Sequence, residues 1–189
     1  MSSSQSKSGL RKTIWNALIL QADFYENARN TPQTKRISLT IVCLAALSHA
    51  IGSGVILLIN LATLPILILS LLIDCLSIMA GYYFWTFSIS KIAEWLKRND
   101  VTFQELLIPI GYAYSPQVLN FLTVIPLLGK QIELLLSVWS LLAVIVAVRQ
   151  GLDIKTRWST LICLVGWPLI QIAIGFIQAF EQYLVKLGN

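Results

Sequence analysis

The sequence predicts an all-α integral membrane protein, a bundle of five transmembrane helices preceded by an amphipathic helix. Hydrophobic residues make up 56% of the 189 residues, and charged residues only 12%. A soluble domain carries about twice that fraction of charged residues. The charged residues also leave long stretches free, as expected of segments that cross a bilayer. One multi-pass membrane domain is therefore expected.

The central stretch, residues 106–149, predicts a transmembrane helical hairpin. No charged residue occurs in 106–129, and none occurs in 134–148. An α-helix rises about 1.5 Å per residue, so about 20 residues cross roughly 30 Å of hydrocarbon. The first segment is long enough outright, and the second reaches this length if Gln131 and Glu133 lie at the interface. Residues 126–131 then form the turn.

The remaining spans follow from a length argument and from capping signals. Residues 37–73 carry no formal charge, and as one helix they would extend about 55 Å, so a break is expected near Asn60–Pro65. Thr102 and Glu105 have the spacing of a capping box that starts the third span. The expected spans are residues 38–59, 65–90, 107–127, 131–149 and 158–180, within a membrane domain over 37–183.

The N-terminal region is expected to hold a disordered tail, residues 1–9, followed by a cytoplasmic amphipathic helix and linker over 10–36. Apolar residues from Leu10 to Ala28 share one face of this helix, although Ile19 falls on the polar side. The helix lies either in the headgroup layer or against the cytoplasmic face of the bundle. The candidate surface for membrane or partner binding comprises Arg11, Lys12, Trp15 and Trp95.

The distribution of basic residues predicts the orientation. With a cytoplasmic N-terminus, the cytoplasmic segments carry twelve Lys and Arg residues, and the opposite side carries only Lys130 and Lys186. This asymmetry is the positive-inside bias of membrane proteins. We therefore expect a cytoplasmic N-terminus and a C-terminus on the opposite side.

Asp74 is the one acidic residue deep in an apolar segment, and such residues are functional candidates. It shares a helical stripe of small residues with Ser70, Ser77 and Gly81, where helices approach closely. His49, the single histidine, is expected at a similar depth on the preceding span. An Asp74–His49 pair is either a proton or ion relay or a structural hydrogen bond between helices.

Other chemistry finds little support in the sequence. The chain has no glycine-rich phosphate loop and no paired carboxylates on one predicted face. Its three cysteines occur inside apolar segments without metal-ligand spacing, which is typical of small buried residues. The basic residues flank apolar spans and do not form a broad nucleic-acid-binding face. We therefore expect no enzymatic activity, no cofactor, no metal ion and no nucleic-acid partner.

The central hairpin resembles the Yip (Ypt-interacting-protein) domain family, as a bacterial-type member. The residues that carry the resemblance are Thr102-Phe103-x-Glu105-Leu106, Gly111-Tyr-Ala-Tyr-Ser-Pro116, Ile125-Pro126-Leu-Leu-Gly129, Trp139 and Ala147-Val-Arg149-Gln-Gly151-Leu. The resemblance implies a five-span bundle with a cytoplasmic N-terminus. Eukaryotic relatives bind Rab GTPases, usually through a longer N-terminal region than the 36 residues expected here, so binding of a small GTPase is not expected.

The sequence supports two main hypotheses for function. The first is a non-enzymatic scaffold or adaptor in membrane organisation or trafficking. The alternative is a small transporter or channel subunit that uses Asp74 and His49, or an assembly factor for a larger membrane complex. The expected partners are the lipid bilayer and either other membrane proteins or further copies of the chain. The expected location is a bacterial cytoplasmic or internal membrane.

Overall fold

The computed structural model describes residues 9–28, 31–59, 61, 63–95 and 102–188, and every regular element among them is a helix. In chain order these elements are α1 (Leu10–Leu18), α2 (Ala22–Glu26), α3 (Pro32–Ile59), α4 (Leu64–Trp95), α5 (Phe103–Ala113), the 3₁₀ helix η1 (Ser115–Val124), α6 (Gly129–Gly151) and α7 (Thr156–Gly188). The all-α prediction is confirmed for this part of the chain.

Three of the described helices, α3, α4 and α6, are long and apolar enough to cross a membrane. The helices extend beyond the predicted spans, because α3 already begins at Pro32, where a linker was expected, and α4 continues to Trp95. The predicted break between the first two spans lies between α3 and α4. Leu61 there has a φ of 58°, a left-handed conformation that does not continue a helix. Residues 1–8 of the predicted tail lie outside the described residues.

The prediction of one N-terminal helix from Leu10 to Ala28 is wrong, because α1 and α2 are separate helices. Leu20 between them has a φ of 56°, which ends the first helix. The turn lets Tyr25 fold back, and its hydroxyl donates to the Ala17 carbonyl at 3.3 Å. Tyr25 is buried, and burial raises the pKa of its hydroxyl. Together, α1 and α2 form a small helical pair.

The third predicted span is not one α-helix but α5 followed by η1. The break comes at Tyr114, just before Pro116, which has no N–H to continue the helical ladder. The Ser115 hydroxyl donates to the Tyr112 carbonyl at 2.7 Å, the carbonyl that a residue at position 116 would otherwise bond. At about 1.5 and 2.0 Å per residue, α5 is about 16 Å long and η1 about 20 Å long.

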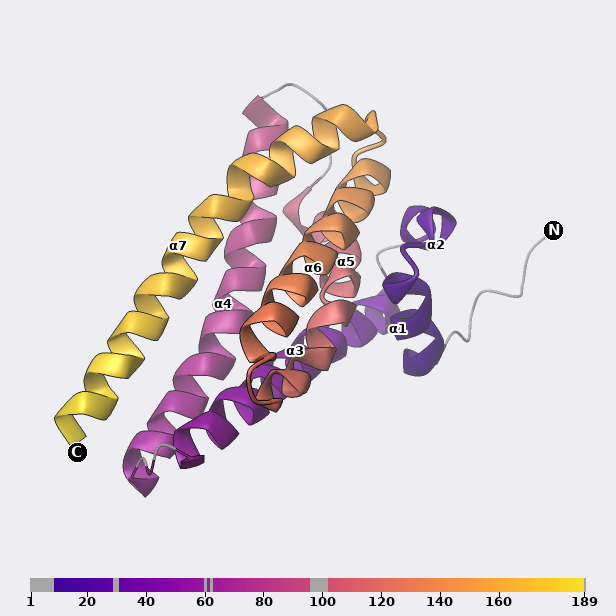
Figure 1. Cartoon of the computed structure of the whole chain (residues 1–189). Helices are drawn as coiled ribbons and strands as arrows, with labels where there is room; N and C mark the ends of the chain where they lie inside the picture. Colours follow the sequence, from indigo (N-terminus) through magenta and orange to yellow (C-terminus); the bar gives the residue numbers. More distant parts are fainter. Residues whose placement is uncertain (1–8, 29–30, 60, 62, 96–101, 189) are drawn as a thin grey trace.

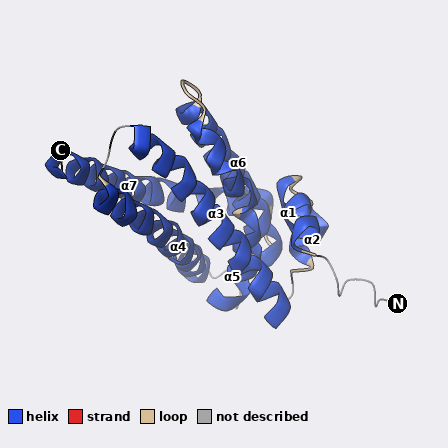
Figure 2. Cartoon of the chain, turned by 90° about the horizontal axis from the view of Figure 1, so that it is seen from below, coloured by secondary structure: helices blue, strands red, loops and turns tan. Residues whose placement is uncertain are grey.

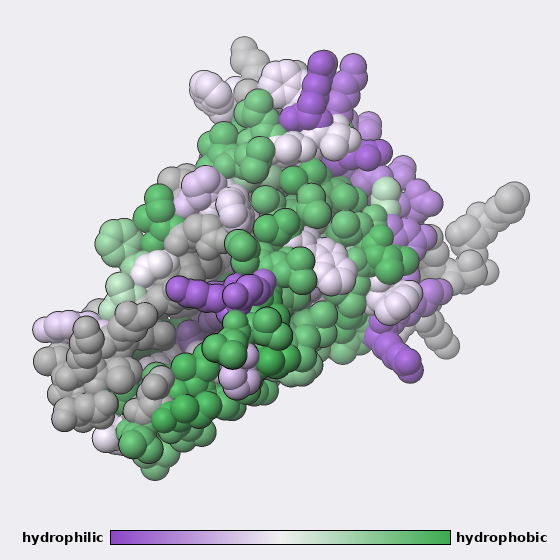
Figure 3. Space-filling view, in the orientation of Figure 1, coloured by the Kyte–Doolittle hydropathy of each residue, from purple (hydrophilic) through white to green (hydrophobic). Residues whose placement is uncertain are grey.

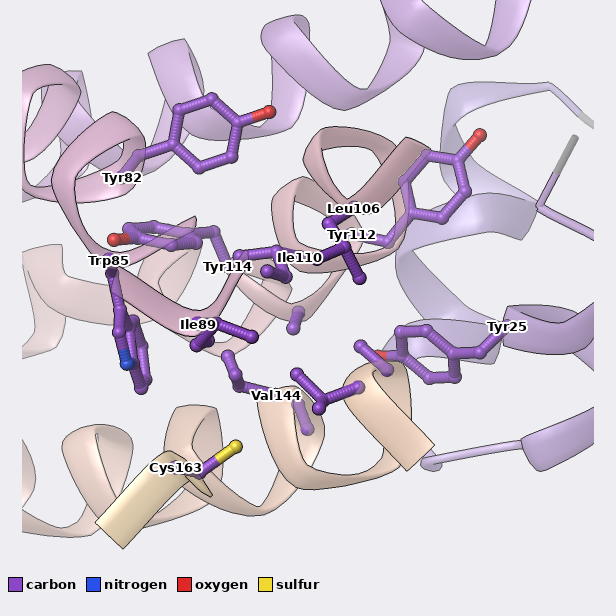
Figure 4. Close-up of a cluster of buried hydrophobic side chains, with 14 of the residues drawn as sticks. Tyr25, Tyr82, Trp85, Ile89, Leu106, Ile110, Tyr112, Tyr114, Val144 and Cys163 are labelled. Atoms are coloured by element: carbon purple, nitrogen blue, oxygen red, sulfur yellow. The ribbon is translucent and has the colours of Figure 1, made fainter. Parts of the chain in front are cut away.

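The α5–η1 segment lies inside the bundle. It packs against α3, α4 and α6, while α7 packs against α4 and α6 (Figures 1 and 2). Every residue from Leu106 to Pro116 is buried. Figure 4 shows buried side chains from α4, α5 and α6 gathered in one cluster that Tyr25 of α2 also reaches.

One junction joins α3, α4 and α5. The Leu107 carbonyl accepts hydrogen bonds from the Tyr82 hydroxyl at 2.7 Å and from the Ser38 hydroxyl at 3.3 Å. Gly111 lies against both donors, since a Cβ at this position would be 2.0 Å from Ser38 Oγ and 3.3 Å from the Tyr82 hydroxyl. Glycine at position 111 is therefore needed for the close approach of the three helices.

The N-terminus of α5 has the predicted capping box. The Thr102 backbone N–H donates to the Glu105 carboxylate at 2.8 Å, and the Thr102 hydroxyl donates to it at 2.9 Å. These bonds lower the pKa of Glu105, because they favour its ionised form. The box confirms the helix start that the Thr102 and Glu105 spacing predicted.

Gly111→Ala is expected to destabilise the protein by about 1–3 kcal/mol, because the new methyl group overpacks the three-helix junction. The apparent melting temperature of the purified protein in detergent measures this. Gly81→Ala in α4 is the matched control, since nothing lies within 4 Å of a Cβ there. That variant should be neutral or gain up to about 1 kcal/mol. Equal stability of the two variants would contradict the packing described here.

Candidate functional site

Asp74 and His49 come together where α3 and α4 pack against each other. Gly54 of α3 allows a close approach to Leu71 of α4, whose Cδ2 would be 3.0 Å from a Cβ at position 54. One turn further along α4, the Asp74 carboxylate lies 3.7 Å from His49 Nε2. The antiparallel course of the two helices thus brings the two side chains close to each other.

The Asp74 carboxylate has a second partner that the sequence analysis missed. The Ser53 hydroxyl donates a hydrogen bond to Asp74 Oδ2, while His49 faces Oδ1. The Asp74 side chain is 7% exposed and that of His49 25% exposed. Ser53 lies one helical turn after His49, and this spacing is the signal that could have identified it. The site is therefore a buried carboxylate that accepts a hydrogen bond from a hydroxyl and faces an imidazole.

The order of these three groups does not suit nucleophilic catalysis. In a serine hydrolase, the imidazole lies between the hydroxyl and the carboxylate and takes the hydroxyl proton. Here the carboxylate lies between Ser53 and His49, so the hydroxyl is not directed to the imidazole. No group of three potential metal-ligating side chains occurs among the described residues. The arrangement joins α3 to α4.

The small-residue stripe around Asp74 is only partly used for packing. Ser70 is buried with Asp74, and its hydroxyl has no hydrogen-bond partner among the described residues. The Ser77 hydroxyl bonds within its own helix, to the Ile73 carbonyl at 2.6 Å. Gly81 has open space beside it. The helix contact is therefore concentrated at Ser70 and Asp74, toward the α3–α4 loop.

A second set of buried polar groups ties η1 to its neighbours. The Ser48 hydroxyl of α3 accepts the Phe121 backbone N–H at 2.8 Å. The Gln117 side-chain amide donates to Ser140 Oγ of α6 at 3.0 Å, and Asn120 donates in turn to Gln117. The sequence analysis did not assign these residues to a site. Amides inside an apolar, proline-broken segment were the available signal.

The candidate binding residues of the N-terminal region lie in two places. Arg11, Lys12 and Trp15 are exposed on α1, which packs against α3, α5 and η1 through its opposite side. Trp95 is the last residue of α4 and is 82% exposed. The end of α4 that precedes α5 lies away from α1 (Figure 1). The four residues therefore do not form one surface.

Comparison of the chain with protein-family models, with curated proteins and with solved structures gave no match.

Asp74→Leu is expected to destabilise the protein by about 1–2 kcal/mol, because it removes the hydrogen bond by which the Ser53 hydroxyl of α3 is joined to the Asp74 carboxylate of α4. Asp74→Asn keeps an acceptor oxygen and should cost clearly less. The apparent melting temperatures in detergent measure both effects. Ser77→Ala is the control in the same helix, since its hydroxyl serves only its own helix. If Asn and Leu at position 74 are tolerated equally, the carboxylate does not tie the helices together.

Proposed function

We propose that this chain is a Yip-type polytopic membrane protein that acts as a non-enzymatic scaffold or adaptor in membrane organisation or trafficking. The observation that carries the proposal is that the family-like positions form contacts between helices. Gly111 lies at the junction of α3, α4 and α5. A Cβ at Gly129 would be 2.4 Å from the Thr123 carbonyl, and a Cβ at Gly151 would be 3.2 Å from Leu106. These positions thus have structural roles.

The proposed membrane arrangement has five spans, formed by α3, α4, α5–η1, α6 and α7. The N-terminus is cytoplasmic, the C-terminus is on the opposite side, and the membrane is a bacterial cytoplasmic or internal one. The twelve-to-two division of basic residues supports this orientation. The face shown in Figure 3 is mainly hydrophobic over its middle and lower left, while hydrophilic residues gather at its upper and right edges, with one further group near its centre. A hydrophobic area of this kind is compatible with contact to lipid.

The polar groups inside the bundle also favour a scaffold. Most of those described have a partner, such as Ser38 with the Leu107 carbonyl and Gln117 with Ser140. Polar groups that are satisfied by neighbouring helices stabilise a membrane bundle, whereas a transport path needs polar groups open to water. The bundle contacts therefore suit a protein that holds its shape and presents its surface to other membrane proteins or to further copies of the chain.

A small transporter or channel subunit is the second candidate function, and the broken α5–η1 segment favours it. Discontinuous helices near the middle of the bilayer often form substrate sites in transporters. The η1 segment also has a buried Asn120 Oδ1 that has no hydrogen-bond partner among the described residues, and Asp74 and His49 would supply a site for protons or ions. An assembly factor for a larger membrane complex is a further alternative.

Reconstituted protein is expected to show no substrate-dependent flux of protons or monovalent cations above that of empty liposomes. Most of the described polar groups bond to neighbouring helices, so few remain to line a continuous water-filled path. Proteoliposomes that contain a pH-sensitive dye measure this under imposed proton, sodium and potassium gradients. Asp74→Asn in the same vesicles is the matched variant. Saturable flux that this substitution abolishes would establish the transporter and reject the scaffold.

A further inference from the structure

Three basic residues lie close together where α6 ends and α7 begins. Arg149 is in the last turn of α6, Lys155 directly precedes α7, and Arg157 is the second residue of α7. All three are exposed, and none of them forms an ion pair within the described part of the chain. We call these three residues the α6–α7 basic patch.

The loop that carries the patch is anchored to the bundle. The Ile154 backbone N–H donates to the Arg149 carbonyl at 3.1 Å, which closes the turn and places the neighbouring Lys155 near Arg149. Leu152, in the same turn, is fully buried in the hydrophobic core. Because the turn is held in this way, the patch has a fixed position on the bundle.

A contact between α6 and α7 shows that the patch lies at the charged end of α6. The Ser159 hydroxyl of α7 donates to the Ile145 carbonyl of α6 at 2.5 Å. From this contact, Arg157 lies two residues, about 3 Å, and Arg149 four residues, about 6 Å, toward the loop. The two arginines are therefore at nearly the same level, just beyond the charge-free stretch of residues 134–148.

The neighbouring helix α4 has its charged end on the same side of the bundle. It runs antiparallel to α7 (Figure 1), and a Cβ at Gly166 of α7 would be 3.3 Å from the Trp85 indole nitrogen of α4. Lys91 lies about 9 Å beyond Trp85, and Arg157 lies about 14 Å from Gly166 in the same direction. Lys91 is paired with Glu94 at 2.7 Å and adds no net charge. In the proposed five-span arrangement this end is the cytoplasmic interface, where the lipid headgroups lie.

Exposed apolar side chains follow the patch along α7. At about 100° of rotation per residue, Leu161 and Leu164 fall within about 40° of Arg157. Leu161 is 51% exposed and Leu164 49% exposed. The α6–α7 loop lies near the upper edge of Figure 1, and Figure 3 shows hydrophilic residues at this edge above a mainly hydrophobic area. The surface therefore combines positive charge at the interface with an apolar stripe that leads into the hydrocarbon.

The charge and the apolar stripe together match one class of partner. Asp153, also exposed, is the one acidic residue among residues 149–157, so the loop keeps two net positive charges. Basic residues at the cytoplasmic interface attract anionic headgroups, and acyl chains match the exposed leucines below them. An acidic soluble protein would match the charge alone, since it could not reach side chains inside the bilayer.

We propose that the α6–α7 basic patch binds the headgroup phosphate of an anionic phospholipid, whose acyl chains lie along Leu161 and Leu164. Arginine and lysine donate charge-assisted hydrogen bonds to phosphate oxygens. The inference rests on the proposed five-span arrangement and names a lipid partner for its cytoplasmic face. It assigns lipid binding to one anchored loop and not to the total positive charge of that face.

Tryptophan quenching by brominated lipids tests the proposal on the full-length protein in vesicles. Trp158 is half-buried next to Arg157, and the difference between the native protein and Trp158→Phe isolates its signal. Phosphatidylglycerol and phosphatidylcholine, each brominated on the acyl chains, are compared at equal mole fractions. The anionic lipid is expected to quench this signal several-fold more strongly. Lys155→Gln with Arg157→Gln should abolish the preference.

Lys35→Gln with Arg36→Gln is the matched control, since both residues are exposed near the start of α3, on the same side of the membrane in the proposed arrangement, and the change in net charge is the same. It should leave the preference of Trp158 intact, and an equal loss would reduce the effect to net charge and overturn the proposal. Equal quenching by both lipids, or none by either because a protein covers the surface, would also overturn it. Flux in the same vesicles and the sidedness of Lys155→Cys are measured independently, so failure of the proposed function remains distinguishable.

Discussion

The structure depends on how the α5–η1 segment satisfies its backbone polar groups. An apolar bilayer offers no water, so each N–H and C=O group must find a partner inside the protein. Pro109 and Pro116 lack the N–H donors that would bond the Glu105 and Tyr112 carbonyls, and the Ser115 hydroxyl bonds the Tyr112 carbonyl instead. Side chains of the surrounding helices bond to the backbone here, as Ser38 and Tyr82 do at the Leu107 carbonyl and Ser48 does at the Phe121 N–H. The two bonds to the Leu107 carbonyl require α3 and α4 to approach α5 closely, which explains the glycine at position 111.

The same packing explains how the N-terminal helices relate to the bundle. Tyr112 of α5 stacks against Phe24 of α2, with ring centroids 5.1 Å apart, and Trp139 of α6 holds the end of α1. These contacts make α1 and α2 part of the folded bundle instead of a free arm. The scaffold proposal depends on this packing, because a fixed helix presents a fixed surface.

Much of the fold could be predicted from the sequence, because apolar length and charge placement determine membrane helices strongly. Apolar length predicts the helix at α4. Residue spacing predicts the capping box at Thr102 and the proximity of Asp74 to His49. The break after Leu18 and the 3₁₀ geometry of η1 were not, since they depend on contacts with distant residues such as Ala17 with Tyr25 and Ser48 with Phe121. The hydrogen bond from Ser53 to Asp74 was not predicted, because a serine among small residues of a membrane helix usually indicates close helix packing.

The side of the membrane on which Lys130 lies tests the central claim, that α5–η1 crosses the bilayer as a broken helix. Thr123, near the end of η1, packs against Gly52, about 10 Å before the end of α3 at Ile59. Lys130→Cys and Lys155→Cys, each in a variant without Cys43, Cys75 and Cys163, are treated with a membrane-impermeant thiol reagent. Five spans predict labelling from opposite sides. Labelling of both cysteines from the same side would make α5–η1–α6 a re-entrant hairpin and contradict the account.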